Sequence, residues 1–229
     1  MRLQERSYST KILRPKPSIY REEDGSLIVV ATSWGQPEHA QRAMDEVIKY
    51  VSSAKSDVEV TSPFEFLSCL SDEVNYVRTG TLIANDILYR GENKMEYFSG
   101  VELLALFRRG PQVAWAQVGC PSLFIQRKNQ SLQPLSIGLD LSSELRGAGE
   151  ILPPLPAQLL GLDPTCYVQC GHTYVNEGDH LVLLASTSVA TSLWSKDSEA
   201  LELGSITTRM IQEDPESPFW LGIVDLEAD

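Results

Sequence analysis

The chain has 229 residues, 42% of them hydrophobic and 22% charged, so we expect one globular domain with a sizeable core. Its net charge of −12 at pH 7 repels phosphate backbones and anionic lipid, which argues against nucleic-acid and membrane-surface binding. No run approaches the ~20 apolar residues of a membrane helix, and the charged N-terminal stretch predicts no secretory signal. The four cysteines lack a compact framework spacing, which favours free thiols and a cytoplasmic location.

The first part of the chain predicts strands followed by helices. Residues 7–14 alternate in polarity and predict an edge-like strand, and a turn at Asp24-Gly25 precedes an apolar strand over residues 27–31. Apolar residues at helical spacing predict a helix from Pro37 to about residue 54. A second helical region over residues 62–91 is expected to be interrupted at Thr79-Gly80.

The second part predicts a run of strands, then two helices and a last strand. Residues 94–136 predict consecutive strands, residues 137–164 an irregular connection, and residues 166–175 and 178–186 two further strands. Residues 188–195 and 198–213 are helical candidates, and residues 219–227 predict a closing strand. This order predicts an α+β fold of antiparallel sheets with helices outside, in a single domain over residues 1–229.

Five motifs occur in a fixed order along the chain. They are "VVATSWGQPEHAQRAM", the pair Ala84-Asn85 before Ser99-Gly100-Val101, "AQVGCPSLFIQR", "GDHLVLLASTSV" and "SPFWLGIV". In the same order they resemble "VVADGMGG", "AN" before "GTT", "ANVGDSRAYLIR", "GDVLLLCSDGL" and "DNITVIVV" of the metal-dependent protein Ser/Thr phosphatases of type 2C (the PPM family). The resemblance spans about residues 7–227. It implies a four-layer α/β/β/α sandwich of two antiparallel sheets flanked by helices.

The resemblance also implies metal-dependent hydrolysis, but this sequence lacks the carboxylates that hold the metals in that family. In that family carboxylates hold two divalent cations, Mn²⁺ or Mg²⁺, and a metal-bridging hydroxide attacks phosphoserine or phosphothreonine. The matching positions here carry neutral residues, namely Thr32, Ser33, Cys120, Thr187 and Ser217. Neutral hydroxyls do not offset the repulsion between two adjacent dications. We therefore expect a degenerate, catalytically inactive member (a pseudophosphatase) without a metal cofactor.

The cysteines allow two further interpretations. Cys120, in the turn Gly119-Cys120-Pro121, would be a nucleophile only beside a general base or a cation, and the sequence fixes none there. We interpret Cys120 as a replaced acidic position. Cys166 and Cys170 would lie roughly 13 Å apart on one strand, too far to share one zinc ion with His172, so we predict that they pack in the core.

Arg14, Trp34 and His39 are the candidate contacts to phosphate or to a partner. Arg14 matches the family's phosphate-binding Arg, although the acidic pair that follows it there is missing. Trp34 is expected in a loop after a strand, where it offers contact area, but burial of Trp34 and Trp220 is the more frequent arrangement. His39 lies at a helix start, where N–H groups bind anions, but a surface His on the first helical turn is the more frequent case.

The predicted activity is regulation through protein binding. The partner would be a phosphoprotein, another signalling component or a second copy of this chain. The alternative is a divergent active phosphatase, in which other carboxylates converge on Mn²⁺ or Mg²⁺; the candidates are Asp24, Asp86, Asp179 and Asp197. The carboxylates of residues 22–24 are instead expected at a hairpin turn facing solvent. N-terminal-nucleophile hydrolases are also sheet sandwiches, but Met1-Arg2 supplies no nucleophile at the first position.

Overall fold

The computed structural model describes residues 1–56, 62–145, 152–194 and 202–226. Within these ranges the chain forms ten strands and three α-helices, and none of the helices is long and apolar enough to cross a bilayer. The strands are β1 (Arg2–Tyr8), β2 (Ser18–Arg21), β3 (Leu27–Trp34), β4 (Gly100–Arg109), β5 (Gln112–Val118), β6 (Ser122–Gln126), β7 (Leu132–Ser136), β8 (Gln169–Tyr174), β9 (His180–Ala185) and β10 (Phe219–Asp225). The helices are α1 (Glu38–Ser56), α2 (Asp72–Ile87) and α3 (Leu203–Glu213), and the shorter helical turns are η1 (Leu88–Glu92), η2 (Leu141–Ser143) and η3 (Thr191–Trp194).

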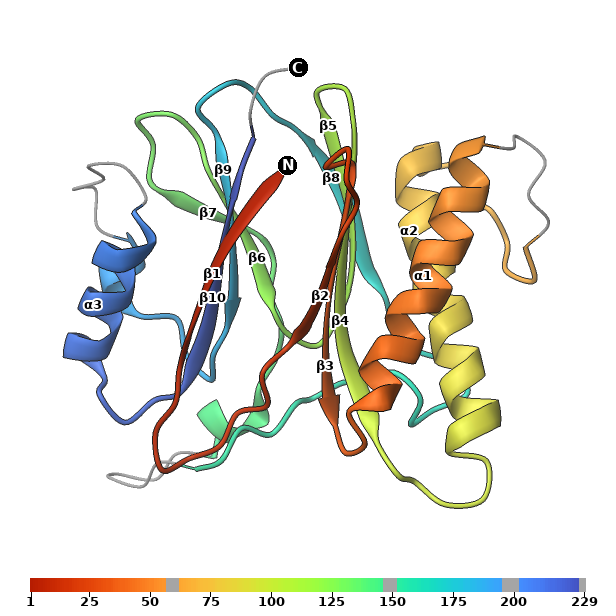
Figure 1. Ribbon diagram of the computed structural model, residues 1–229, viewed down its shortest axis with the longest axis horizontal. Coiled ribbons are helices and arrows are strands. Elements are labelled where there is room, and N and C mark those ends of the chain that lie inside the picture. The colour runs from red at the N-terminus through yellow and green to blue at the C-terminus, as the bar shows by residue number, and fades with distance from the viewer. Residues whose placement is uncertain (57–61, 146–151, 195–201, 227–229) are drawn as a thin grey trace. The chain divides into compact units, whose positions relative to one another are not determined.

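The chain divides into two compact units, each built on one five-stranded antiparallel sheet (Figure 1). Unit 1 comprises residues 1–16, 120–157 and 175–229, with the strand order β1-β10-β9-β6-β7. Unit 2 comprises residues 17–119 and 158–174, with the strand order β2-β3-β4-β5-β8. The predicted α+β class, with two antiparallel sheets that carry helices, is confirmed. The single domain over residues 1–229 stays a prediction.

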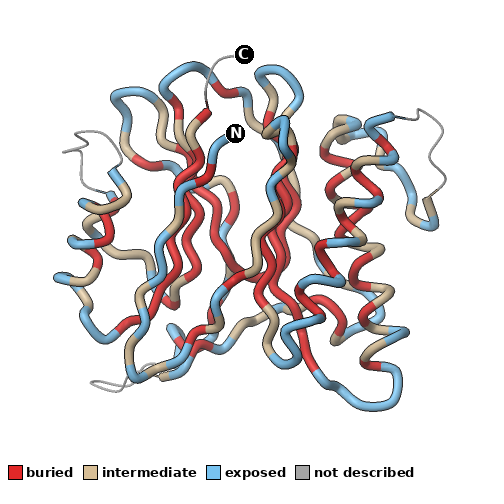
Figure 2. The backbone as a smooth tube through the Cα atoms, viewed as in Figure 1, coloured by how far each residue is buried: buried red, intermediate tan, exposed pale blue. Residues whose placement is uncertain are grey.

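In unit 2, α1 and α2 cover one face of the sheet (Figure 1). Leu27, Val29 and Ala31 of β3 share a core cluster with both helices, and Ile28 and Val30 on the opposite face of the strand are also buried. Burial on both faces explains the continuous apolar run in the sequence. Figure 2 shows the same pattern as an unbroken buried stretch of strand beside helices that are buried along one side only.

Helix α2 runs without interruption through Thr79-Gly80, so the break expected there is wrong. Ser71 caps its first turn, because the Ser71 hydroxyl accepts a hydrogen bond from the Val74 backbone N–H at 3.4 Å. A Cβ on Gly80 would lie 3.3 Å from the Cα of Val47 on α1. The glycine therefore permits a close crossing of two helices, and this packing outweighs its low helix propensity.

In unit 1, α3 covers one face of the sheet (Figure 1). Its Ile206 and Met210 join Phe124, Leu184 and Leu221 in a second core cluster. At about 25 cal/mol per Å² of apolar area, burial of each such side chain contributes about 1.5–3 kcal/mol. The sheet and its one amphipathic helix thus form a second layered core.

Several predicted elements differ from the structure. The first strand is β1, at residues 2–8 instead of 7–14, because β1 pairs along the full length of β10 and residues 9–14 have no strand partner there. Residues 62–70 and 94–98 are irregular, and the strand expected from residue 166 begins at Gln169. Of the helix expected over residues 188–195, the described residues 188–194 contain only η3. The last helix is confirmed as α3, while residues 195–201 lie outside the described ranges.

Candidate functional site

Thr187 and Arg14 converge on a carboxylate that the sequence analysis did not single out, Asp140. Thr187 lies just after β9, and its hydroxyl donates to Oδ2 of Asp140 at 3.2 Å. Arg14 Nη2 lies 2.8 Å from the same oxygen, and the two side chains are only 3% and 2% exposed. Unit 1 therefore holds a buried ion pair at a position where the resemblance predicted a metal ligand.

The second carboxylate oxygen of Asp140 is also fully engaged. Its Oδ1 accepts hydrogen bonds from the Ser142 hydroxyl at 2.6 Å, the Ser142 N–H at 3.1 Å and the Leu155 N–H at 2.9 Å. Burial by itself raises the pKa of Asp140, but these hydrogen bonds and the Arg14 charge outweigh it, so the pKa is lowered. Asp140 is therefore an anion at neutral pH whose lone pairs are used by protein donors.

The other neutral residues in unit 1 that match metal-ligand positions of the family, Cys120 and Ser217, are also buried. Cys120 is 1% exposed and Ser217 is 6% exposed. Ser217 lines a cavity of about 210 Å³ with Ser186 and Ser188, beside the carboxylates of Glu213 and Asp214. Glu213 binds the N–H groups of Thr191 and Ser192 at the start of η3, and Asp214 accepts from the Glu216 N–H. Hydroxyl groups, and carboxylates with local structural partners, therefore line this cavity.

In unit 2 a buried carboxylate stands opposite Thr32. Thr32 on β3 pairs with Glu102 on β4, and both are buried, Glu102 completely. The indole N–H of Trp34 donates to Oε2 of Glu102 at 2.9 Å. Trp34 is thus the half-buried last residue of β3 and not a loop residue, while Trp220 is buried as expected. The neighbouring hydroxyl of Ser33 donates to the Gln36 carbonyl at 2.6 Å.

His39 is buried, which contradicts the interpretation of a surface histidine. Its Nδ1 lies within hydrogen-bonding distance of the Ser99 hydroxyl, and its Nε2 lies 3.3 Å from Oε2 of Glu92, which also binds Arg42. A Cβ on Gly35, whose φ is +153°, would lie 2.2 Å from the Cβ of Ser99. The ring therefore joins the start of α1 to η1 and to the residue before β4.

Three of the four carboxylates of the alternative active-site hypothesis have local ion-pair partners. Asp24 binds Lys55 and Asp86 binds Arg90, both within unit 2. The Lys55 ammonium and hydrogen bonds from Ser26 lower the pKa of Asp24 to about 2. Asp179 binds Arg127 at the opposite end of β9 from Thr187. Asp197 lies outside the described residues.

Cys166 and Cys170 pack against the core cluster of unit 2, as predicted. Burial raises the pKa of the Cys166 thiol to about 11, and burial also raises the pKa of Cys170. Both thiols are thus protonated at neutral pH. Among the residues that the structure describes, no three His, Cys, Asp or Glu side chains gather in a way that would hold a metal.

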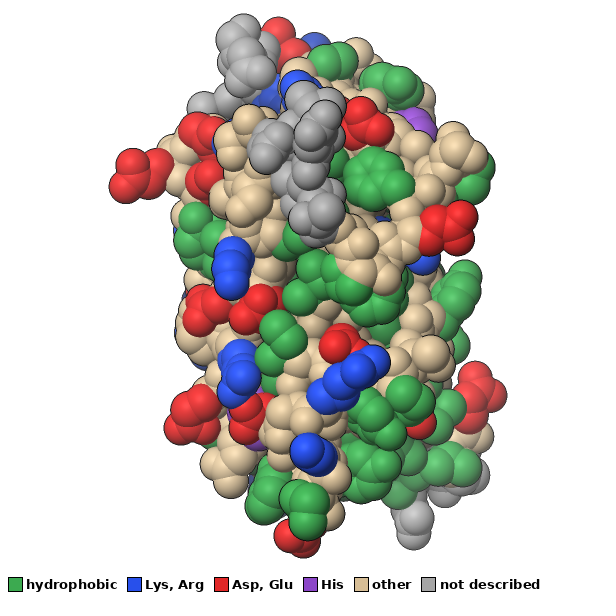
Figure 3. Space-filling view, turned by 90° about the vertical axis from the view of Figure 1, so that its right-hand side faces the viewer, with side chains coloured by type: hydrophobic (Ala, Val, Ile, Leu, Met, Phe, Trp, Pro, Cys, Tyr) green, Lys and Arg blue, Asp and Glu red, His purple; other side chains and the backbone are tan. Residues whose placement is uncertain are grey.

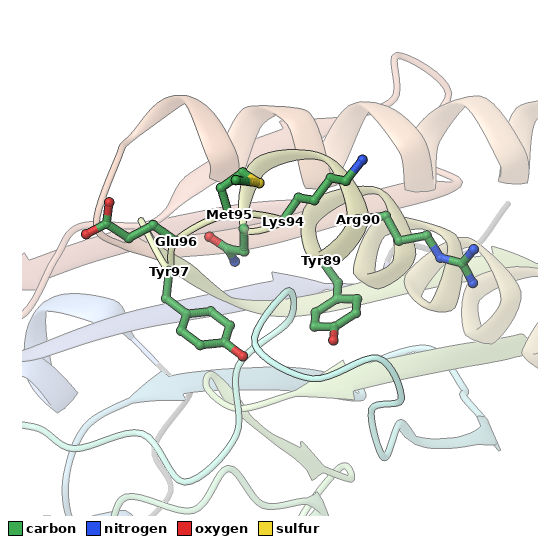
Figure 4. Close-up of a pocket in the computed structure, with 7 residues that line it drawn as sticks. Tyr89, Arg90, Lys94, Met95, Glu96 and Tyr97 are labelled. Carbon is green, nitrogen blue, oxygen red and sulfur yellow. The ribbon is translucent and has the colours of Figure 1, made fainter.

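A cavity of about 660 Å³ lies where η1 leads into β4, in unit 2. It is lined by Tyr89, Arg90, Asn93, Lys94, Met95, Glu96 and Tyr97. In Figure 4 the rings of Tyr89 and Tyr97 point to the same side, while Arg90 and Glu96 extend in opposite directions. Figure 3 shows hydrophobic side chains gathered in the lower part of the face that carries α1 and α2. A strand was predicted over residues 94–98, so no signal in the sequence indicated this site.

Asn93 fixes the segment that forms this cavity. Its side-chain NH₂ donates to the carbonyls of Ser99 at 2.8 Å and Gly161 at 2.7 Å, and its Oδ1 accepts from the Phe98 N–H at 3.0 Å. Because both ends of residues 94–98 are held, their apolar side chains are presented without further ordering. Met95 is 92% exposed, Tyr97 67% and Phe98 54%.

Solved structures resemble the whole chain. The serine/threonine phosphatase PstP/Ppp of Mycobacterium tuberculosis gives a TM-score of 0.67 at 15% identity and covers 99% of this chain and 98% of its own. The PPM Ser-Thr phosphatase MsPP of Mycobacterium smegmatis, solved with cacodylate, gives 0.65 at 14% identity and covers 99% of both chains. This chain has the fold of the PPM-type Ser/Thr phosphatases.

A third structure with the PPM-type fold is a regulator. PppA, a key regulatory component of T6SS in Pseudomonas aeruginosa, gives a TM-score of 0.62 at 16% identity and covers 98% of this chain and 97% of its own. No family model and no curated protein matches the sequence. The predicted resemblance is thus confirmed for the fold.

The residues present at the matching positions do not fit the two cations that the PPM-type fold implies. Thr32, Cys120, Thr187 and Ser217 offer hydroxyls and a thiol where hard divalent cations need anionic oxygens. Asp140, which receives a hydrogen bond from Thr187, is already bound by five protein donors. The donor set therefore lacks the negative charge and the open lone pairs that a dication pair needs.

Proposed function

We propose that this chain is a catalytically inactive phosphatase-like domain that acts by binding another protein. The observation that supports this most directly is the state of Asp140, whose two oxygens bind Arg14, Thr187, Ser142 and the Leu155 N–H. A carboxylate already paired with a buried guanidinium is a poor cation ligand, since binding the metal would strand the Arg14 charge. Without metals no attacking hydroxide is generated at neutral pH.

The proposed partner is a phosphorylated protein segment that enters the cavity of residues 89–97. Arg90 and Lys94 supply two cations for a phosphate group, and the rings of Tyr89 and Tyr97 supply apolar area for the flanking side chain. Arg90 also forms an ion pair with Asp86. This binding mode, the absence of a metal cofactor and the cytoplasmic location all stay predictions.

Hydrolysis of p-nitrophenyl phosphate and of a phosphothreonine peptide in millimolar manganese tests the loss of catalysis. We expect no turnover above buffer, and no heat of manganese binding by calorimetry. An active PPM-type phosphatase assayed in parallel is the positive control. Turnover that depends on manganese and on this chain's concentration would falsify the proposal.

Binding of a fluorescent phosphoserine peptide with flanking leucines tests the partner. Fluorescence anisotropy should report tighter binding than for the unphosphorylated peptide, and Lys94→Gln should weaken it by about tenfold, the loss of one charge-assisted contact of about 1.4 kcal/mol. Lys49→Gln, a change of an exposed lysine on α1, is the matched control and should leave the affinity unchanged. Equal binding of both peptides would reject phosphate recognition but not the loss of catalysis.

One observation favours the second candidate, a divergent active phosphatase. Glu102 is a buried carboxylate directly across the β3–β4 ladder from Thr32, and could serve as a cation ligand from the neighbouring strand. If the manganese assay shows turnover, Glu102→Gln should abolish it. Asp86→Asn, which removes a carboxylate already paired with Arg90, should leave it intact.

A further inference from the structure

Four strands form the edges of the two sheets, and three of them carry features that discourage pairing with another chain. β1 carries Arg2, Glu5 and Arg6, and β7 contains Pro134 opposite a register shift in β6. β2 is only four residues long and follows Lys16-Pro17. Charges, proline, bulges and short length are the usual means by which sheet edges avoid association.

β8 is the edge that lacks these features. It ends the strand order of unit 2 and reads Gln-Cys-Gly-His-Thr-Tyr, with no charged residue and no proline. The uncharged stretch extends from Thr165 to Asn176, in a chain with 31 acidic and 19 basic residues. Tyr167, just before β8, is 70% exposed, and Tyr174, its last residue, is 60% exposed. An exposed strand of this composition is the kind of edge to which another strand adds.

β8 is also held in place within its own sheet, without a partner chain. It pairs with β5 over its whole length, from Gln112↔Tyr174 to Gln117↔Gln169. A Cβ on Gly171 would lie 2.8 Å from the Trp115 ring, so that ring covers the glycine. An ordered edge loses little conformational entropy when a strand pairs with it.

We propose that β8 pairs with β8 of a second copy of this chain, joining the two unit 2 sheets into one antiparallel sheet. Directly opposite residues in an antiparallel pair have their side chains on the same face of the sheet. A two-fold axis perpendicular to the sheet would therefore lie between the two copies of Gly171 or between the two copies of His172. In both registers the residues brought opposite one another within β8 include no Asp, Glu, Lys or Arg, which avoids the penalty for like charges on opposed strands. The same pairing between two copies of β1 would bring charged side chains into the ladder.

The affinity of two copies for one another should depend on the salt concentration. Two copies that each carry a net charge of −12 repel one another, and salt screens that repulsion over distances of about 10 Å at 0.1 M. Self-pairing through a neutral edge should therefore strengthen as salt is raised. A basic partner bound to this acidic chain would show the opposite dependence.

Sedimentation equilibrium of the whole chain, from about 5 µM to about 500 µM, covers the affinity expected for a small interface. The apparent mass should rise from 25.4 kDa toward twice that value with concentration, and more steeply at higher salt. His172→Lys places an ammonium at or beside the two-fold axis and should raise the dissociation constant by at least about tenfold. Ser7→Lys, at an exposed position on the β1 edge, is the matched control and should leave the constant unchanged.

Each outcome of this experiment decides the proposal. Thermal unfolding of both variants shows whether the monomer is intact, since both positions are exposed. A mass of 25.4 kDa at every concentration and salt overturns the proposal. A dimer whose dissociation constant is unchanged by His172→Lys also overturns the proposal, as does one that Ser7→Lys weakens to the same extent. In either case the contact would lie elsewhere. Hydrolysis assays have no bearing on it.

Discussion

Each unit contains a cluster in which one carboxylate binds several donors, and the two clusters differ in how much water reaches them. In unit 1 the side chains of Arg14 and Asp140 are 3% and 2% exposed. In unit 2 the side chains of Arg42 and Glu92 are 49% and 26% exposed. Removing one partner should therefore lower the free energy of unfolding much more for the buried ion pair than for the exposed one. The reason is that it leaves an uncompensated charge in the interior.

Removing the guanidinium from the buried cluster should produce the largest loss. Arg14→Met leaves the Asp140 anion without its cation, and we expect the free energy of unfolding to fall by about 3–5 kcal/mol in urea titrations. Combining it with Asp140→Leu should restore part of the loss, because no charge is then stranded. A loss below about 1 kcal/mol for Arg14→Met would place this pair among ordinary surface ion pairs.

The next largest effect should come from the glycine beside the half-exposed cluster. Gly35→Ala places a Cβ 2.2 Å from the Cβ of Ser99 and 2.3 Å from the Phe98 carbonyl, at a φ of +153°. We expect a loss of about 1–3 kcal/mol, measured by thermal unfolding. Gly110→Ala is the control, since its φ is +58° and its Cβ would meet nothing within 4 Å. Equal losses would assign the effect to φ alone and not to the contact with Ser99.

Acid should weaken both units through carboxylates whose folded pKa is depressed. Hydrogen bonds from Thr191 and Ser192 lower the pKa of Glu213 from 4.5 to about 2, and Lys55 lowers that of Asp24 from 3.8 to about 2. Depressed pKa values stabilise the folded state above the unfolded pKa, and this contribution is lost as pH falls toward 2. The denaturant concentration at the unfolding midpoint should therefore decrease as the pH is lowered from about 4.5 to about 2. Glu213→Gln should flatten that fall; an unchanged slope would contradict the assignment.

The smallest effect should come from the exposed ion pair. Arg42→Gln removes a half-exposed partner of Glu92, and we expect at most about 1 kcal/mol, decreasing with added salt. Urea titrations at low and high salt measure it. A loss comparable with that of Arg14→Met would remove the difference between the two clusters.

The order of elements and the fold class followed from hydrophobic patterns and from five motifs in sequence. The continuous apolar run over residues 27–31 predicted the strand β3, and the helical spacing from Ala40 to Val51 predicted α1. These predictions held because a strand or an amphipathic helix carries its own periodicity along the chain. The break at Thr79-Gly80 was wrong, because the close approach of Val47 that favours a glycine there is not local information.

The amino-acid sequence is sufficient to show that Thr32, Cys120, Thr187 and Ser217, at the positions where the resemblance predicted metal ligands, supply no carboxylate. Which carboxylates lie beside Thr32 and Thr187 follows instead from contacts between residues far apart in the chain. Asp140 lies 126 residues from Arg14, Glu102 lies 68 residues from Trp34, and His39 lies 60 residues from Ser99. Such contacts depend on how strands and loops distant in sequence are brought together, and local propensity carries no record of that.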